Sequence, residues 1–131
     1  MKYPTEAQEQ AAIFRWASIQ RCKYPELDLL YHIPNEGKRN AVTGANLKRQ
    51  GLKKGVPDMC LPVARGGKHG LYIELKRRGG RVSPEQAWWI KGLNSVGYAA
   101  CVCYGAEEAI ETIREYLKGC VVGDGVRTSD N

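Results

Sequence analysis

Two acidic residues and one lysine stand out in the middle of the chain. Asp58 and Glu74 are the only acidic residues between Lys38 and Arg81, a span that carries twelve lysines and arginines. Lys76 follows Glu74 by two residues. Such acids can be ordinary surface ion-pair partners, which are common and contribute little stability. They can also hold a divalent cation such as Mg²⁺ or Mn²⁺, which prefers carboxylate, water and phosphate oxygens as ligands.

The segments 56–63 and 70–76 are predicted to form two adjacent strands. Between them, ARGGKHG contains the glycines that suit a tight reversal. Side chains two apart share one face of a strand, so Glu74 and Lys76 project together while the alternate residues point into the core. The reversal brings Asp58 close to Glu74, and two such carboxylates repel each other unless a cation lies between them. This pattern indicates a metal site in which Lys76 orients or activates the attacking water, or neutralises charge that develops on a phosphate.

The positive charge is concentrated in the middle third of the chain. The net charge is +6, yet residues 38–81 hold twelve basic against two acidic residues, and the rest holds eight against twelve. Such a field favours a polyanion, because Lys and Arg contact the phosphates of nucleic acid whatever its sequence. A solvated basic face is the alternative. The expected phosphate contacts are Lys53, Lys54, Lys68, Arg77, Arg78 and Arg81, with Lys38, Arg39, Lys48 and Arg49 as a further patch.

Four helices and four strands are expected, in the order αβαββαβα. The helices are expected at about 5–22, 41–50, 83–95 and 106–118, and the strands at 27–33, 56–63, 70–76 and 98–104. Thr5 with Gln8 forms a capping-box pattern, and Ser83 followed by Pro84 is typical of a helix start. The first helix is expected to bury Ile13, Trp16, Ala17 and Ile19. This order implies an α/β fold with a mixed β-sheet flanked by helices.

The length of 131 residues fits one domain, expected over 1–118 with a loose C-terminal tail at 119–131. No apolar run is long enough to span a membrane, and MKYPTEAQEQ lacks the apolar region of a signal peptide. We therefore expect a cytoplasmic protein without a membrane partner. The five cysteines have no CxxC spacing, which favours reduced thiols, and Cys101 and Cys103 are expected on one face of a strand. A zinc site would need further ligands, for which only His32 and His69 are available.

The acidic motifs resemble those of a known superfamily. Pro57-Asp58, followed after fifteen residues by Glu74-Leu75-Lys76, looks like the PD-(D/E)XK motif of the restriction-endonuclease-like superfamily. Within it, KKGVPDMCLP, GLYIELKRRGGRVSPEQAWWIKGLNSVGYAACVCY and IPNEGKR resemble the VRR-Nuc family, small nucleases of phages and bacteria that also form the catalytic domain of a eukaryotic DNA-repair nuclease. The likeness covers residues 5–118 and implies a restriction-endonuclease-like core. GVPD, ELK and SPEQ at these distances are more specific than an isolated PD and ExK, which are common by chance.

The resemblance also implies roles for individual residues. Asp58 and Glu74 correspond to metal-binding carboxylates, the backbone carbonyl of Leu75 to a further metal ligand, and Lys76 to the catalytic lysine.

Two further roles stay open. Gln86 resembles a glutamine placed near the site, but it follows Ser83 by three residues and can equally complete a capping box. The family also uses a glutamate of the first helix, for which Glu6 is the choice. Glu9 is the alternate, because residues three apart lie close together on a helix.

The expected activity is Mg²⁺-dependent hydrolysis of DNA phosphodiesters, with Mn²⁺ as a substitute. The resemblance implies structure-selective cleavage of branched DNA, such as four-way junctions, by a homodimer, since one site per chain needs two copies to cut two strands symmetrically. A non-catalytic nucleic-acid-binding module of the same fold and an RNA-processing nuclease are the alternatives. The sequence has no GxxxxGK[ST] loop, so no nucleotide cofactor is expected. Of the adjacent Trp88 and Trp89, one is expected in the core and the other could meet a partner or DNA.

Overall fold

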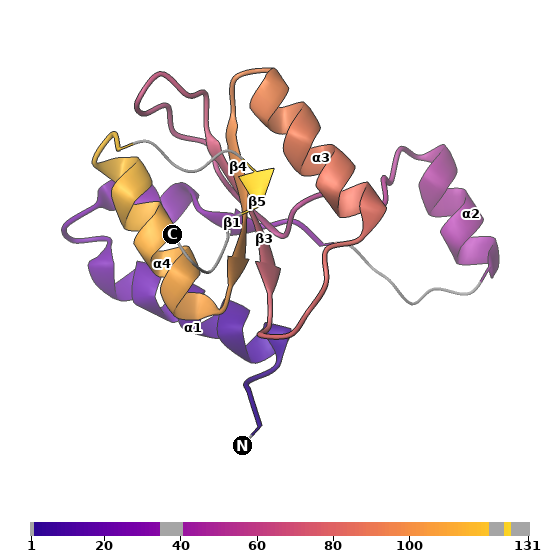
Figure 1. Ribbon diagram of the computed structural model, residues 1–131, viewed down its shortest axis with the longest axis horizontal. Helices are drawn as coiled ribbons and strands as arrows, with labels where there is room; N and C mark the ends of the chain where they lie inside the picture. Colours follow the sequence, from indigo (N-terminus) through magenta and orange to yellow (C-terminus); the bar gives the residue numbers. More distant parts are fainter. Residues whose placement is uncertain (1, 35–40, 121–124, 127–131) are drawn as a thin grey trace.

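A five-stranded mixed sheet forms the centre of the molecule (Figure 1). The computed structural model describes residues 2–34, 41–120 and 125–126. The elements are α1 (Glu6–Gln20), a 3-10 helix η1 (Pro25–Leu29), β1 (Tyr31–His32), α2 (Ala41–Arg49), β2 (Met59–Leu61), β3 (Leu71–Lys76), α3 (Pro84–Ser95), β4 (Ala99–Tyr104), α4 (Ala106–Leu117) and β5 (Gly125–Val126). The strands lie side by side in the order β1-β2-β3-β4-β5. This arrangement confirms the expected α/β fold with a mixed sheet flanked by helices.

Helices cover both faces of the sheet (Figure 1). α1 and α4 pack against each other on one face, where Ile13 and Ile113 are fully buried. α3 covers the other face, where Ile90 packs with alternate residues of β4. Cys101 and Cys103 both lie in the core under α1 and α4, as the alternation of side chains along a strand predicts.

β2 and β3 form the antiparallel pair that the sequence predicts. Met59 pairs with Ile73 and Leu61 with Leu71, so the chain reverses between the two strands. β3 then pairs in parallel with β4, and α3 makes the crossover between them. Because Asp58 precedes Met59 and Glu74 follows Ile73, this register brings the two acids together at one end of the strand pair.

The two predicted helix starts, at Thr5 and Ser83, are confirmed, since each residue forms a capping box. The Thr5 hydroxyl accepts a hydrogen bond from the Gln8 amide at 3.1 Å, and the Gln8 side chain accepts one from the Thr5 amide at 2.8 Å. Of the expected buried residues of α1, Ile13 and Ala17 are buried and Trp16 is half-buried. The prediction for Ile19 was wrong, since it is 64% exposed. Ile19 follows Ile13 by six residues, which turns it by roughly 120° from the buried face of the helix.

The expected strand at 27–33 was also wrong for most of its length. Residues Pro25–Leu29 form a 3-10 helix, and only Tyr31–His32 pair with β2. Pro25 suits the first position of this turn because its ring fixes a helical φ. Leu27 and Leu30 are buried three residues apart, a spacing that fits a turn of 3-10 helix rather than the alternation of a strand.

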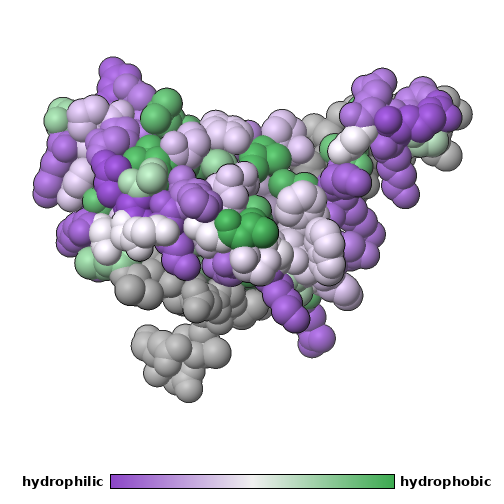
Figure 2. Space-filling model, turned by 90° about the horizontal axis from the view of Figure 1, so that it is seen from above, coloured by the Kyte–Doolittle hydropathy of each residue, from purple (hydrophilic) through white to green (hydrophobic). Residues whose placement is uncertain are grey.

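α2 lies apart from the sheet and the other helices in Figures 1 and 2, and its surface in Figure 2 is mostly hydrophilic. In the expected C-terminal tail, Gly125–Val126 pair in parallel with β4 as β5, so these two residues belong to the sheet instead of a loose end. Across the described ranges, no helix has the length and apolar character needed to cross a membrane.

Candidate active site

Asp58 is held rigidly where β2 meets β1 and β3. Its Oδ2 accepts a hydrogen bond from the Leu75 amide at 2.7 Å. Its carbonyl oxygen accepts one from the Ile33 amide at 2.7 Å and lies 2.9 Å from Nδ1 of His32. Both the backbone and the carboxylate of Asp58 are therefore fixed by neighbouring strands.

Glu74 and Lys76 are buried on the same side of β3. Glu74 is 2% exposed and Lys76 is 9% exposed. The Lys76 Nζ lies 3.6 Å from Oε2 of Glu74. Oε1 of Glu74 is also buried, and no group in the described part of the chain donates a hydrogen bond to it. A buried carboxylate oxygen without a donor is unfavourable, and a bound cation would satisfy it.

Both carboxyl groups have raised pKa values, and Asp58 disfavours ionisation of Glu74. Burial and the negative charge of Asp58 together raise the pKa of Glu74 to about 8, against the opposing effect of Lys76. Burial also raises the pKa of Asp58, while the hydrogen bond from the Leu75 amide opposes this shift. A buried Glu74 beside a half-buried Asp58, both with raised pKa values, suits a site that receives a cation, because the cation would favour both ionised forms.

The two glutamates of α1 that the sequence left open have different surroundings. The charge of Glu6 acts on Asp58 and raises its pKa, so Glu6 lies on the side of the acidic pair. Glu9 instead accepts a hydrogen bond from the Ala106 amide at 3.2 Å, at the start of α4. The helix begins after Gly105, where an added Cβ would lie 2.8 Å from Oε2 of Glu9. Glu9 thus serves as a substitute cap for α4. A role of Glu6 at the acidic pair stays a prediction, because no group of three or more acidic, histidine or cysteine side chains that could hold a metal forms among the described residues.

The loop before Asp58 is fitted against the start of α3. Gly55 has φ +90°, and a Cβ at this position would lie 2.7 Å from the backbone carbon of Glu85 and 2.9 Å from the nitrogen of Gln86. Only glycine meets both conditions. The Gln86 side chain accepts a hydrogen bond from the Ser83 amide at 2.9 Å, which confirms its capping role. A further role of Gln86 at the acidic pair stays a prediction.

The predicted phosphate contacts fall into separate groups. Arg77, Arg78 and Arg81 are exposed directly after β3, next to Lys76, and the Arg78 guanidinium lies 5.5 Å from the centre of the Tyr3 ring. Lys68 lies at the opposite end of the β2–β3 pair, beside the reversal.

The remaining basic residues flank α2 or lie on it. Lys53 and Lys54 are exposed in the loop before Gly55, and Lys48 and Arg49 are exposed on α2. Lys38 and Arg39 lie outside the described residues. Among the described basic residues, Arg77 and Arg78 directly follow Lys76 in the chain, and Lys53 and Lys54 precede Asp58 by five and four residues.

His32 was not predicted as a neighbour of the acidic pair. It reaches the carbonyl of Asp58 because β1 pairs with β2, with His32 opposite Met59. β1 has only two residues, so its pairing leaves no clear periodic signal in the sequence. The nearest signal is IPNEGKR, which the family resemblance already contains and which begins directly after His32.

A mixed sheet flanked by helices, with an Asp-Glu-Lys group where β2 begins and β3 ends, is consistent with the restriction-endonuclease-like class of nucleases. Among solved structures, a "VRR_NUC domain protein" is similar with a TM-score of 0.79 and 34% sequence identity, over 95% of this chain and 94% of that chain. The family model of the VRR-NUC domain matches residues 4–107. This chain belongs to the VRR-NUC family, whose domains are of nuclease type. No curated protein matches the chain.

Proposed function

We propose that this protein is a metal-dependent endonuclease that hydrolyses DNA phosphodiesters. The observation that carries the proposal is the acidic pair, in which the buried Oε1 of Glu74 receives no hydrogen bond from the described residues while Lys76 lies beside Oε2. An acidic pair of this kind inside a basic segment fits a cation that meets phosphate oxygens. Membership of the VRR-NUC family supports the same reaction.

The residues that would hold the metal are Asp58, Glu74, the backbone carbonyl of Leu75 and Glu6. Their oxygen atoms suit Mg²⁺, with Mn²⁺ as a substitute. When bound, such an ion polarises a phosphoryl oxygen and lowers the pKa of a coordinated water.

The chain's own residues would position the substrate and stabilise charge. Asp58 is fixed by the Leu75 amide, so its carboxylate needs little reorganisation during the reaction. Lys76 is held beside Glu74 with a buried stem, and its ammonium would orient the attacking water or neutralise charge on the phosphate. Arg77, Arg78 and other exposed basic residues would hold the DNA backbone without reading its sequence.

The proposed substrate is branched DNA, such as a four-way junction, cut by a homodimer. One acidic site per chain supports the dimer, because symmetric cleavage of two strands needs two sites. The concentration of positive charge supports a substrate with several closely spaced phosphates. A role in phage or bacterial DNA repair is the setting that the family resemblance suggests.

Cleavage assays with labelled linear, flap and four-way-junction DNA, and with matching RNA, test the proposal. The protein should cut DNA with Mg²⁺ or Mn²⁺ and not with EDTA. Asp58→Asn and Glu74→Gln should abolish cleavage, whereas Asp28→Asn, which changes an exposed acid of η1, should not. Cleavage that persists in EDTA or in both site variants would refute the metal mechanism. Binding without cleavage under either metal would favour the non-catalytic module, and cleavage of RNA alone would favour the RNA-processing nuclease.

A further inference from the structure

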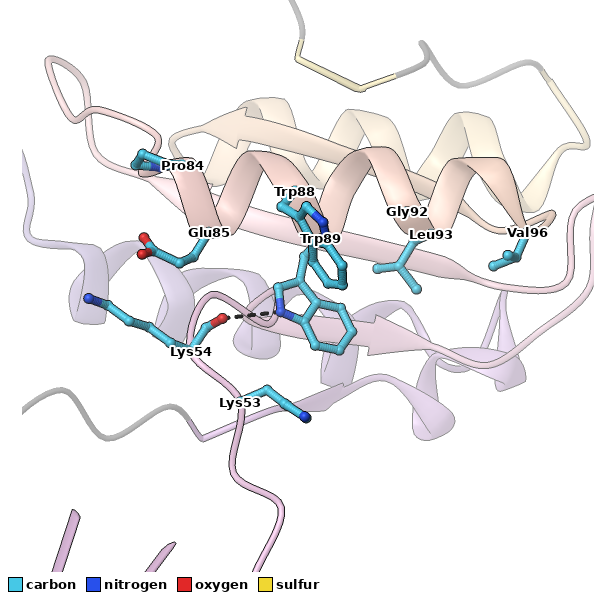
Figure 3. Close-up of a pocket in the computed structure, with 9 residues that line it drawn as sticks. All are labelled: Lys53, Lys54, Pro84, Glu85, Trp88, Trp89, Gly92, Leu93 and Val96. Carbon is cyan, nitrogen blue, oxygen red and sulfur yellow. Dashed lines mark hydrogen bonds between the residues drawn. The ribbon is translucent and has the colours of Figure 1, made fainter. Parts of the chain in front are cut away.

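A concave pocket of about 680 Å³ lies between the outer face of α3 and the loop that follows α2 (Figure 3). The residues that matter here are Lys53 and Lys54 from the loop and Glu85, Trp88, Trp89 and Leu93 from α3. The volume falls in the usual range for sites that bind small ligands. The acidic pair described above does not line this pocket.

Two tryptophans form the aromatic part of the pocket. Trp88 is 70% exposed, which is unusual for so large an apolar ring. The Trp89 indole Nε1 donates a hydrogen bond to the Lys54 carbonyl at 3.1 Å (Figure 3). The two rings meet edge to face, with centroids 5.8 Å apart. Trp89 is thus fixed, and it supports Trp88, whose ring surface remains open to a ligand.

The edge of the pocket is mainly basic. Lys53 and Lys54 are both exposed, and Glu85 is the single acid among the described residues that line it. Exposed aromatic rings next to lysines are the combination that binds unpaired nucleic acid, because bases stack on the rings and phosphates pair with the cations. Protein interfaces, by contrast, are depleted of lysine. The charge of the pocket therefore favours a nucleotide over a protein partner.

The pocket is continuous with the loop that carries Asp58. Gly55 packs directly against Glu85 and Gln86, so this loop lies in close contact with the start of α3. Lys54 and Asp58 are four residues apart, which places their Cα atoms no more than about 14 Å apart. A strand whose phosphate lies at the acidic pair can therefore reach the pocket within a few nucleotides.

We propose that this pocket binds an unpaired nucleotide close to the scissile phosphate, with its base stacked on Trp88 and its phosphate paired with Lys53 and Lys54. The proposal rests on the proposed nuclease function and makes it more specific. It gives the protein a means to select DNA that has unpaired bases, without reading their sequence.

Binding measured in EDTA tests this proposal without any cleavage. The probes are a fluorescently labelled paired duplex, the same duplex with a short single-stranded flap, and a third duplex whose flap is abasic. The parent protein should bind the flap duplex more tightly than the other two. Trp88→Ala should weaken binding to the flap duplex by roughly 5- to 150-fold, the effect of losing about 1–3 kcal/mol of base stacking. The affinity of the Trp88→Ala protein for the abasic-flap duplex should equal the affinity of the parent protein for that duplex.

Three control variants make the test specific. Trp88→Phe should retain most of the preference for the flap, because a phenyl ring still stacks. Lys53→Gln with Lys54→Gln should weaken binding to the flap duplex and the abasic-flap duplex alike, since both keep their phosphates. Leu29→Ala, which removes an exposed apolar side chain of η1, should change nothing.

Two results would overturn the proposal. The first is equal weakening by Trp88→Ala for all three duplexes, or no weakening at all. The second is a change of oligomeric state in Trp88→Ala, measured by sedimentation, together with an unchanged flap preference, which would make the pocket a contact between two copies of the chain. A flap preference that depends on Trp88 in a protein that cleaves nothing would support the pocket and refute only the nuclease. Metal-dependent cleavage without a Trp88 effect would refute only the pocket.

Discussion

The acidic pair and the α3 pocket differ in how firmly their side chains are held. Asp58 and Glu74 are anchored at strand ends, where an amide fixes one carboxylate and a buried lysine flanks the other. Trp88 and Lys53 are exposed on a helix and a loop. Reaction chemistry needs fixed groups, whereas the capture of a variable substrate needs accessible ones. In the proposed function, the groups for the reaction lie in the sheet and the groups for substrate capture lie on the surface.

Loss of the Lys76 charge tests the fixed side of this comparison and should have the largest effect. Lys76→Met keeps most of the buried stem but removes the ammonium beside Glu74. We expect the single-turnover cleavage rate to fall on the order of 10²–10³-fold, the usual effect of losing one group that stabilises charge in a transition state. DNA affinity should change little. Lys118→Met, at an exposed lysine beyond α4, is the matched control, and an unchanged rate in Lys76→Met would exclude a catalytic role.

The raised pKa of Glu74 predicts a stability that depends on pH when no metal is present. The pKa of Glu74 rises from 4.5 to about 8 in the folded protein, so the folded state binds more protons than the unfolded state between these values. The free energy of unfolding should therefore fall as pH rises through this window, by an amount on the order of a few kcal/mol. Glu74→Gln should reduce the slope. Urea denaturation from pH 5 to pH 9 in EDTA measures it, with Glu111→Gln at an exposed site as the control.

Added Mg²⁺ should reverse this destabilisation in the parent protein. At a concentration of about 100 times its dissociation constant, a ligand of the folded state adds roughly 2.7 kcal/mol. The free energy of unfolding of Glu74→Gln should increase less on addition of Mg²⁺. Equal gains in both proteins would contradict a metal site at Glu74.

Gly55 joins the two regions, so a substitution there should affect both. Gly55→Ala places a methyl group 2.7 Å from Glu85 atoms and requires φ +90° of a residue with a side chain. We expect a destabilisation of about 2–4 kcal/mol. Gly67→Ala is the matched control, because Gly67 has φ +81° but open space around it, and it should lose only about 1–2 kcal/mol. Equal melting temperatures of Gly55→Ala and Gly67→Ala would show that the close contact between Gly55 and α3 adds no destabilisation.

The two glutamates of α1 should respond in opposite ways. Glu9→Ala removes the acceptor for the Ala106 amide and should lower the free energy of unfolding by about 1 kcal/mol. Glu6→Ala should leave stability in EDTA almost unchanged but weaken Mg²⁺ binding, measured by calorimetry. The reverse pattern would assign the metal site to Glu9.

The smallest effect is expected on the open basic surface. Replacing Arg77 and Arg78 by glutamine should lower the slope of log affinity against log salt by about 2, because two backbone phosphate contacts are lost. Affinity should fall similarly for all DNA sequences. The paired substitution of Arg15 and Arg21 on and just after α1 is the control. An unchanged slope would remove Arg77 and Arg78 from the DNA contact surface.

The sequence predicts the acidic pair well because its geometry is local. Alternation on β3 and one tight reversal suffice to bring Asp58 to Glu74, and both features appear in the residue pattern. The choice between Glu6 and Glu9 depends instead on how α1 packs against α4, which is a long-range contact. The error at 27–33 has a related cause, since a short apolar segment fits both a strand and a 3-10 turn, and only packing decides between them.

The pocket beside α3 also could not be predicted from the sequence. The adjacent tryptophans predict that their rings point in different directions, but not that Trp89 is tied to the Lys54 carbonyl. That bond joins residues 35 positions apart. No local pattern contains it.

The reversal between β2 and β3 has a practical consequence for labelling the protein. It lies at the end of the strand pair opposite the acidic residues, and Gly67 at its tip has open space around it. Its neighbour Gly66 packs against Gly119 and should be kept. A short peptide tag inserted after Gly67 would therefore attach a dye or an affinity handle to the sheet while leaving the acidic pair and the arginines after β3 unobstructed.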